Sequence, residues 1–312
     1  MNNKAKIAIA CGALLLAAGL GTVAFLHRPS ERGVPTAVGQ ERIAVEAPTE
    51  ATTLPIYDYV PSETGLTERA KMLLKQNKDV AGWIRIEHTD VDYPFVKDPG
   101  YISEEDSFYG GAAYEPNYYY LDHAFDRSYD REGTLFMDYR DTFGSIEEEQ
   151  SENIIIYGHN MANNNMFGSI RRYRQDYGFF EQSPFIELSS NYRDYDYVIC
   201  CCCITSGYWY SDFIYWNMEE LDDESTFNEY MEKARGRQLF DTGVDVKYGD
   251  KLLTLSTCYA NDDNSRFLVI ARRLRDGEVA GELSTIERTE AYKQAHASAE
   301  ASAENSSEEG AR

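Results

Sequence analysis

Seven short segments of apolar, β-branched and aromatic residues recur between residues 82 and 274, and this pattern constrains the fold most strongly. Such segments, bounded by turn-forming residues, are typical of β-strands. Many strands with few helices predict a mainly β domain whose sheet closes, or nearly closes, into a barrel. Their irregular spacing argues against a propeller. The segments are GWIRIEH (82–88), VDYPFV (91–96), GTLFMDY (133–139), NIIIYG (153–158), DYVICCCCI (196–204), KLLTLSTC (251–258) and RFLVIARRL (266–274).

Three segments have the period of an amphipathic helix instead. Apolar residues recur at i, i+4, i+7 and i+8 from Leu66, which predicts a helix that opens the domain. The same reasoning predicts helices over about 165–177 and about 226–234, with Ser225 as the N-cap of the latter.

The N-terminus contains twenty consecutive residues without a charge, IAIACGALLLAAGLGTVAFL (7–26). As a helix they would span ~30 Å, the thickness of the hydrocarbon core of a bilayer. Lys4 and Lys6 precede them, so we expect residues 1–26 to be a cytoplasmic N-terminus and a single transmembrane anchor. A cleaved signal peptide is the alternative. The anchor predicts a location in the cell membrane with the rest of the chain outside the cytoplasm.

Composition divides the remainder of the chain. Residues 27–63 are rich in Pro, Thr, Glu and Ala and suit an extracytoplasmic linker. Residues 64–280 form the predicted domain, and 281–312 form a low-complexity polar tail, which we expect to be disordered from about Arg288 onward. The net charge of −23 argues against nucleic acid as a partner, because phosphate binding needs a basic surface.

Cys200–Cys203 are four consecutive cysteines in a predicted strand. Alternation sends two of them to each face, so they cannot surround one tetrahedral metal ion. Adjacent residues are also poor disulfide partners. We interpret the four as small buried hydrophobes, and no metal site is predicted.

Cys258 differs, because it ends a strand beside a loop. If Leu253 and Leu255 point into the core, Thr254, Ser256 and Cys258 share the opposite face. His159 also ends a strand, and Arg266 begins the strand after Cys258.

A thiolate attacks acyl carbons to form a thioester, an imidazole exchanges protons near neutral pH, and a guanidinium offers fixed donors to an oxyanion. The order histidine before cysteine excludes papain-like peptidases. His88 and His123 are interpreted as surface groups. Arg272 and Arg273 lie ~20 Å from Arg266 along an extended strand, at the opposite rim, where we expect solvation.

The motifs YGHNM (157–161) and TLSTC (254–258), with an arginine strand after them, resemble the sortase family of Gram-positive transpeptidases. The resemblance is to class B sortases in particular and covers about 77–274. It is carried by DVAGWIRIEHTDVDYPFV, NYYYLDHAF, GTLFMDYR, NIIIYGHNMANNNMFGSI and DTGVDVKYGDKLLTLSTC. Two stretches depart from the usual pattern, an insertion at 100–116 and the four-cysteine strand.

The resemblance implies a closed eight-stranded sortase barrel and a membrane-anchored cysteine transpeptidase. Cys258 would be the nucleophile, His159 the acid and base, and Arg266 the holder of the oxyanion or the substrate backbone. The implied partners are a surface protein with a C-terminal sorting signal, cleaved after threonine, and an amine of cell-wall peptidoglycan. No cofactor is implied.

Residues that bind the sorting signal are less well indicated. In this family the connection before the last strands selects the substrate, which here is near TSGYWYSDFIYW (205–216). Its aromatic residues either pack on the peptide or only cover the barrel. The candidates are Tyr208, Tyr210, Ile214, Ser256 and Thr257. Two other functions stay open: a pilin-polymerising sortase and a non-catalytic anchored surface module.

Overall fold

The computed structural model describes residues 65–103, 113–145, 150–175, 177–217, 221–259 and 264–297. All of them belong to one compact unit, Leu54–Arg312. The predicted anchor (1–26), the linker up to residue 64 and the end of the tail (298–312) lie outside the described residues. Within the described residues, every helix is too short or too polar to cross a bilayer.

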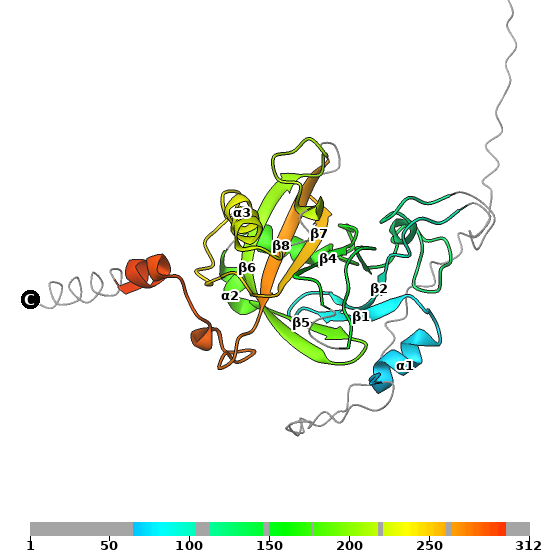
Figure 1. Ribbon diagram of the computed structural model, residues 1–312, viewed down its shortest axis with the longest axis horizontal. Coiled ribbons are helices and arrows are strands. Elements are labelled where there is room, and N and C mark those ends of the chain that lie inside the picture. Colours follow the sequence, from blue (N-terminus) through cyan, green and yellow to red (C-terminus); the bar gives the residue numbers. More distant parts are fainter. Residues whose placement is uncertain are drawn as a thin grey trace, which may run out of the picture. The chain divides into compact units, whose positions relative to one another are not determined.

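Eight strands close into a barrel in the order β1-β2-β3-β4-β7-β8-β6-β5 (Figure 1). The predicted closed, mainly β fold is therefore confirmed. The strands are β1 (Val80–Arg85), β2 (Asp92–Lys97), β3 (Phe136–Met137), β4 (Asn153–Tyr157), β5 (Phe185–Ser190), β6 (Asp194–Ser206), β7 (Leu252–Cys258) and β8 (Ser265–Arg273).

Two of the eight neighbouring pairs, β2–β3 and β4–β7, are parallel, and the others are antiparallel. A parallel pair needs a crossover connection. Between β4 and β7 that crossover contains β5, β6 and the helix α3 (Glu224–Arg235). Because parallel strands point the same way, β4 and β7 end at the same rim of the barrel.

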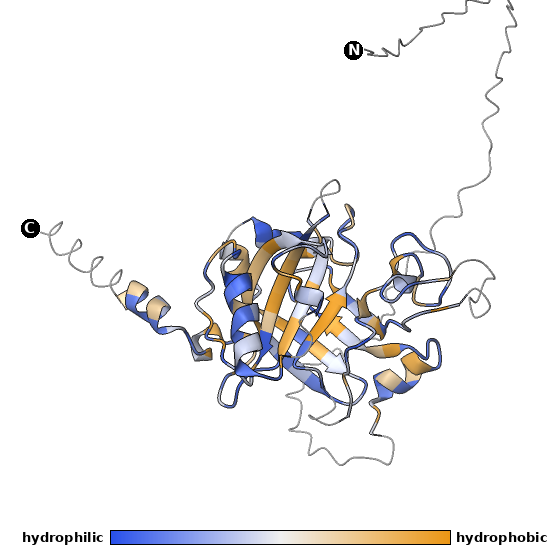
Figure 2. Cartoon of the chain, turned by 45° about the horizontal axis from the view of Figure 1, so that its top comes forward, coloured by the Kyte–Doolittle hydropathy of each residue, from blue (hydrophilic) through white to orange (hydrophobic). Residues whose placement is uncertain are grey.

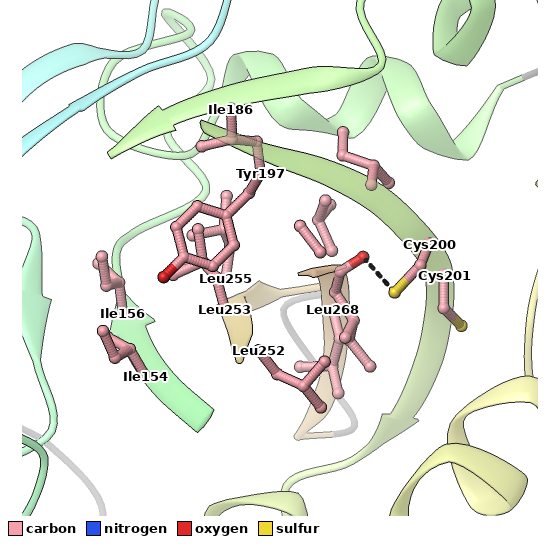
Figure 3. Close-up of a cluster of buried hydrophobic side chains, with 14 of the residues drawn as sticks. Ile154, Ile156, Ile186, Tyr197, Cys200, Cys201, Leu252, Leu253, Leu255 and Leu268 are labelled. Carbon is pink, nitrogen blue, oxygen red and sulfur yellow. Dashed lines mark hydrogen bonds between the residues drawn. The ribbon is translucent and has the colours of Figure 1, made fainter. Parts of the chain in front are cut away.

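The barrel is filled by aliphatic and aromatic side chains. The predicted strands supply many of them, and these strands are mostly orange in Figure 2. Figure 3 shows part of this core, including Ile154, Ile186, Tyr197, Leu253 and Leu268. One strand, β5, was not predicted. It alternates buried Ile186 and Leu188 with the more exposed Glu187, but the pattern is short and follows a proline.

All four cysteines of β6 are buried, as predicted. The register with β8 is irregular between Ile199 and Cys201. The Cys200 thiol donates to the Ile270 carbonyl at 3.3 Å and points toward the core, whereas the Cys201 sulfur points away from it (Figure 3). Burial raises the pKa of Cys200 and Cys202, so these thiols stay protonated and serve as packing groups.

The predicted helices need two corrections. α1 (Glu68–Leu74) and α3 lie where the apolar period placed them, although Asp223, not Ser225, caps α3 by accepting from the Thr226 N–H at 2.9 Å. The single helix expected over 165–177 is wrong. The segment forms a 3₁₀ helix, η3 (Ser169–Arg174), and a separate helix, α2 (Tyr177–Gln182), follows it. Further 3₁₀ turns are η1 (Tyr119–Leu121), η4 (Tyr215–Asn217) and η5 (Leu283–Thr285).

The folded part continues past residue 280, the expected start of the polar tail, because later residues pack on it. Ile286 is buried, Arg288 forms a β-bridge with Val244, and the hydroxyls of Tyr292 and Tyr177 are 3.1 Å apart. A helix covers residues 290–297. The expectation of disorder from Arg288 is therefore wrong for residues up to 297.

Arg272 is fully buried, and the expectation that it is solvated is wrong. Both of its terminal nitrogens lie 2.6 Å from the carboxylate of Glu278, whose side chain is 6% exposed. Burial alone would raise the pKa of Glu278. Hydrogen bonds from Arg272 and from the backbone N–H groups of Arg275 and Glu287 outweigh burial and lower that pKa to about 2.

We predict that this ion pair makes stability fall in acid. A lowered folded-state pKa stabilises the fold above the unfolded-state value of about 4.5, and this contribution is lost as pH falls from there toward 2. The loss is on the order of 3 kcal/mol. Urea unfolding between pH 6 and 3 should show it, and Glu278→Gln should be less stable at pH 7 with a flatter pH dependence. Equal slopes for the two proteins would contradict the assignment.

Candidate active site

The parallel register of β4 and β7 sets the position of His159. Tyr157 pairs with Ser256, and the Gly158 N–H donates to the Ser256 carbonyl at 3.2 Å. The register, continued for two residues, places His159 beside Cys258, where both strands leave the barrel. Neighbouring strands are ~4.8 Å apart, so the two side chains start from adjacent backbone positions.

The antiparallel pair of β7 and β8 sets the position of Arg266. Cys258 and Arg266 are direct partners, and Arg266 also pairs with Thr205 of β6. The expectation that Cys258 and Arg266 lie near each other is confirmed. Along this rim the order is therefore His159, Cys258, Arg266, Thr205, on four neighbouring strands.

One nitrogen of His159 is already bound. Its Nε2 lies 2.7 Å from the carbonyl oxygen of Leu121. A carbonyl can only accept, so Nε2 carries the hydrogen and Nδ1 is the nitrogen that can take up or release a proton. The residue before His159 must be small, because a Cβ on Gly158 would lie 2.3 Å from Leu135 and 2.8 Å from Phe167.

Side chains that the sequence analysis missed hold the ends of β4 and β7 together. The Asn160 amide donates to the Cys258 carbonyl at 2.9 Å, and Arg171 donates to the Asn160 side-chain oxygen at 3.2 Å. Arg174 donates to the Tyr259 carbonyl at 2.9 Å. Two arginines of η3, one of them through Asn160, thus hold the backbone carbonyls of Cys258 and of the residue after it. Only the place of Asn160 directly after His159 could have indicated this role.

The hydroxyls of Ser256 and Thr257 are occupied within the barrel wall. Ser256 Oγ is 2.6 Å from the Tyr215 hydroxyl, and Thr257 donates to the Gly158 carbonyl at 2.7 Å. Burial raises the pKa of Tyr215 to about 12; among the smaller influences, Arg266 lowers the pKa and Cys258 raises it. Tyr215 therefore stays protonated and lies close to both. Direct contact of Ser256 or Thr257 with a substrate stays a prediction.

The connection after β6 contains aromatic residues of two kinds. Tyr208 and Tyr210 are exposed and stack on each other with ring centroids 5.0 Å apart. Phe213 and Tyr215, in the same connection, are buried. Ile214 is half-buried. The buried rings cover the barrel, and the exposed ones are open to a ligand. A role of Tyr208, Tyr210 and Ile214 in binding peptide stays a prediction.

An open cleft of about 570 Å³ lies beside His159. Residues 113–131, which precede β3, form its walls together with His159. His123, in the same segment, is 5% exposed and stacks on Tyr119, so its interpretation as a surface group is wrong. Within the described part of the chain, no group of three or more His, Cys, Asp or Glu residues is arranged to hold a metal ion.

Comparison with known proteins gives consistent relatives, although no family model matches the sequence. Sortase B of Listeria monocytogenes is 31% identical over 191 residues, which are 61% of this chain and 67% of that protein. Sortase B of Staphylococcus aureus is 25% identical over 208 residues, 65% of this chain and 73% of that protein. The solved Staphylococcus aureus sortase B–substrate complex has a TM-score of 0.53 at 24% identity and covers 68% of this chain and 87% of that chain.

The solved structure shows the likeness in fold, and the Listeria relative shows the likeness in sequence over 191 residues. Together with a histidine, a cysteine and an arginine on neighbouring strand ends, they lead to one conclusion: the chain belongs to the class B sortases, a family of cysteine transpeptidases.

Proposed function

We propose that this protein cleaves a C-terminal sorting signal after threonine and transfers the protein ahead of it to an amine of cell-wall peptidoglycan. The observation that carries the proposal is the order of three groups along one rim. His159, two residues after β4, lies beside Cys258 of β7 when the register is continued, and Cys258 pairs with Arg266 of β8. The substrate complex of the Staphylococcus aureus relative supports a sorting-signal peptide as the ligand.

In the first half-reaction the Cys258 thiolate attacks the threonine carbonyl carbon. The guanidinium of Arg266 stabilises the negative charge that develops on the carbonyl oxygen. His159 gives the proton on Nδ1 to the leaving amine, the carbon–nitrogen bond breaks, and a thioester remains on Cys258.

The second half-reaction reverses these roles. An incoming amine attacks the thioester carbon, and His159 takes up its proton at Nδ1. The carbon–sulfur bond breaks, the Cys258 thiolate is regenerated, and the new amide carries the protein. Water in place of the amine gives hydrolysis, which is the peptidase activity.

Location in the cell membrane is part of the proposal. The uncharged segment 7–26 supports a single anchor with the catalytic domain outside the cytoplasm. A pilin-polymerising sortase would join the thioester to a lysine of another protein subunit, and a non-catalytic module would form no thioester. Product analysis with a purified pilin-type protein and with peptidoglycan fragments separates these functions.

We predict that Cys258→Ala removes both hydrolysis of a sorting peptide and transfer to an amine, because the other described cysteines are all buried. Cys201→Ala and Cys202→Val should keep activity and lose about 1 kcal/mol of stability each. Activity is measured by chromatography of the peptide products. If Cys201→Ala or Cys202→Val folds but is inactive, and Cys258→Ala is active, then Cys258 is not the nucleophile.

We also predict that His159→Ala inactivates the enzyme, while His88→Ala does not. His159 is the proton carrier, whereas His88 is exposed in the turn between β1 and β2. Both variants are measured in the same peptide assay, with circular dichroism as a check of folding. Retained activity in His159→Ala would contradict its role.

A further prediction concerns Arg266. Its replacement by alanine should lower kcat/KM by about a hundredfold to a thousandfold, as the loss of one oxyanion donor does in other enzymes. Arg266→Lys should restore part of this, because an ammonium lacks the planar fork of a guanidinium.

Arg273→Ala is the matched control for Arg266→Ala. Arg273 lies on the same strand at the opposite end, where it stacks on Tyr195. The variant Arg273→Ala should leave kcat/KM nearly unchanged. Equal losses in both alanine variants would remove Arg266 from the active site.

A further inference from the structure

The two half-reactions proposed above do not use the cleft beside His159. The cleft nevertheless opens onto His159, the residue that exchanges protons with the amine in the proposed mechanism. His159 forms one of its walls, and Leu121, whose carbonyl accepts from His159 Nε2, forms another. The volume of about 570 Å³ is sufficient for a small peptide or amino acid.

The rim of the barrel separates the two substrates of a transpeptidase. Cys258 lies between His159, just after β4, and Arg266 on β8. Next along the rim is β6, which is followed in the chain by the exposed pair Tyr208 and Tyr210. The acyl peptide is held where the oxyanion forms, which is the Arg266 side. In the proposed mechanism His159 takes the proton of the amine, and His159 is the member of the trio that lines the cleft.

The walls of the cleft have a defined chemistry. Glu115 is exposed and offers a carboxylate that attracts an ammonium group; Asp122 adds negative charge beside it, although its Oδ1 already lies 2.8 Å from His123 Nδ1. Arg131, which is exposed, offers a guanidinium to a carboxylate. Tyr118 and Tyr129 are exposed rings that can cover an aliphatic stem. A primary amine that carries a carboxylate on the same short stem complements all three kinds of group.

We propose that the cleft formed by residues 113–131 and His159 is the acceptor site, and that it takes a primary amine of an amino acid or short peptide with a free carboxylate. The proposal rests on the proposed transpeptidase function. The amine enters as an ammonium beside Glu115 and Asp122, passes a proton to the solvent, and attacks the thioester as a neutral amine. His159 Nδ1 then takes the second proton, as in the second half-reaction.

Two probe amines that differ only in the carboxylate test the proposal. Triglycine ends in a carboxylate and triglycinamide in a neutral amide. Transfer from a sorting peptide to each amine is followed with the full-length protein, and the ratio of the two kcat/KM values is calculated within each variant. Formation of the thioester is common to both reactions and cancels in this ratio.

Triglycine should be preferred about threefold to fivefold, the effect of one exposed ion pair. Arg131→Gln should bring the ratio close to one. Glu115→Gln should raise KM for both amines and leave the ratio intact. The matched control is Arg85→Gln, which removes an exposed arginine from β1; it should keep the ratio of the unaltered protein. If the ratio of the two kcat/KM values is the same in Arg131→Gln as in the unaltered protein, the cleft is not the acceptor site.

Direct binding separates failure of this proposal from failure of the proposed function. Triglycine is titrated into ¹⁵N-labelled full-length Cys258→Ala, which cannot form a thioester, and amide shifts are followed by NMR. Shifts at residues 113–131 that weaken in the Arg131→Gln background support the site, even if the unaltered enzyme makes no thioester. Binding elsewhere, or binding indifferent to Arg131 and Glu115, overturns the site and leaves the proposed function standing.

Discussion

The parallel pairing of β4 with β7 is the constraint on which the rest of the site depends. It brings two chain segments about one hundred positions apart into register and ends them at the same rim. An antiparallel pairing of these strands would place His159 and Cys258 at opposite ends of the barrel. The long crossover that a parallel pair requires also supplies β5, β6 and α3, so the same constraint builds much of the barrel.

The face of β7 that carries Cys258 is polar, and its hydroxyls are held by hydrogen bonds. Thr254 donates to Asn153 at 2.9 Å, and the Tyr230 hydroxyl of α3 lies 2.7 Å from Thr254. Ser256 bonds to Tyr215 in the same way. Each bond contributes only about 1 kcal/mol net, but an unpaired buried hydroxyl would cost more. These bonds therefore fix the register of the strand that carries Cys258.

Local patterns predicted the strands with long apolar runs and the nearness of Cys258 to Arg266, because a short loop between antiparallel strands is a local feature. They did not predict that β4 lies beside β7, since strand order depends on long-range packing. The burial of Arg272 was not predicted, for a related reason. Its partner Glu278 lies in a loop. Loops have no periodic pattern of apolar residues, so the sequence does not show which loop residue pairs with a buried charge. The cleft beside His159 likewise arises from an irregular segment.

The central claim is that Cys258 carries the acyl group between the two halves of the reaction. Intact-mass spectrometry after an acid quench, during turnover of a sorting peptide, tests it most directly. We expect an adduct with the mass of the peptide up to its threonine, mapped to Cys258 by digestion and removed by hydroxylamine as a thioester is. An active enzyme with no adduct at any time, or with the adduct on Cys200–Cys203, would contradict it.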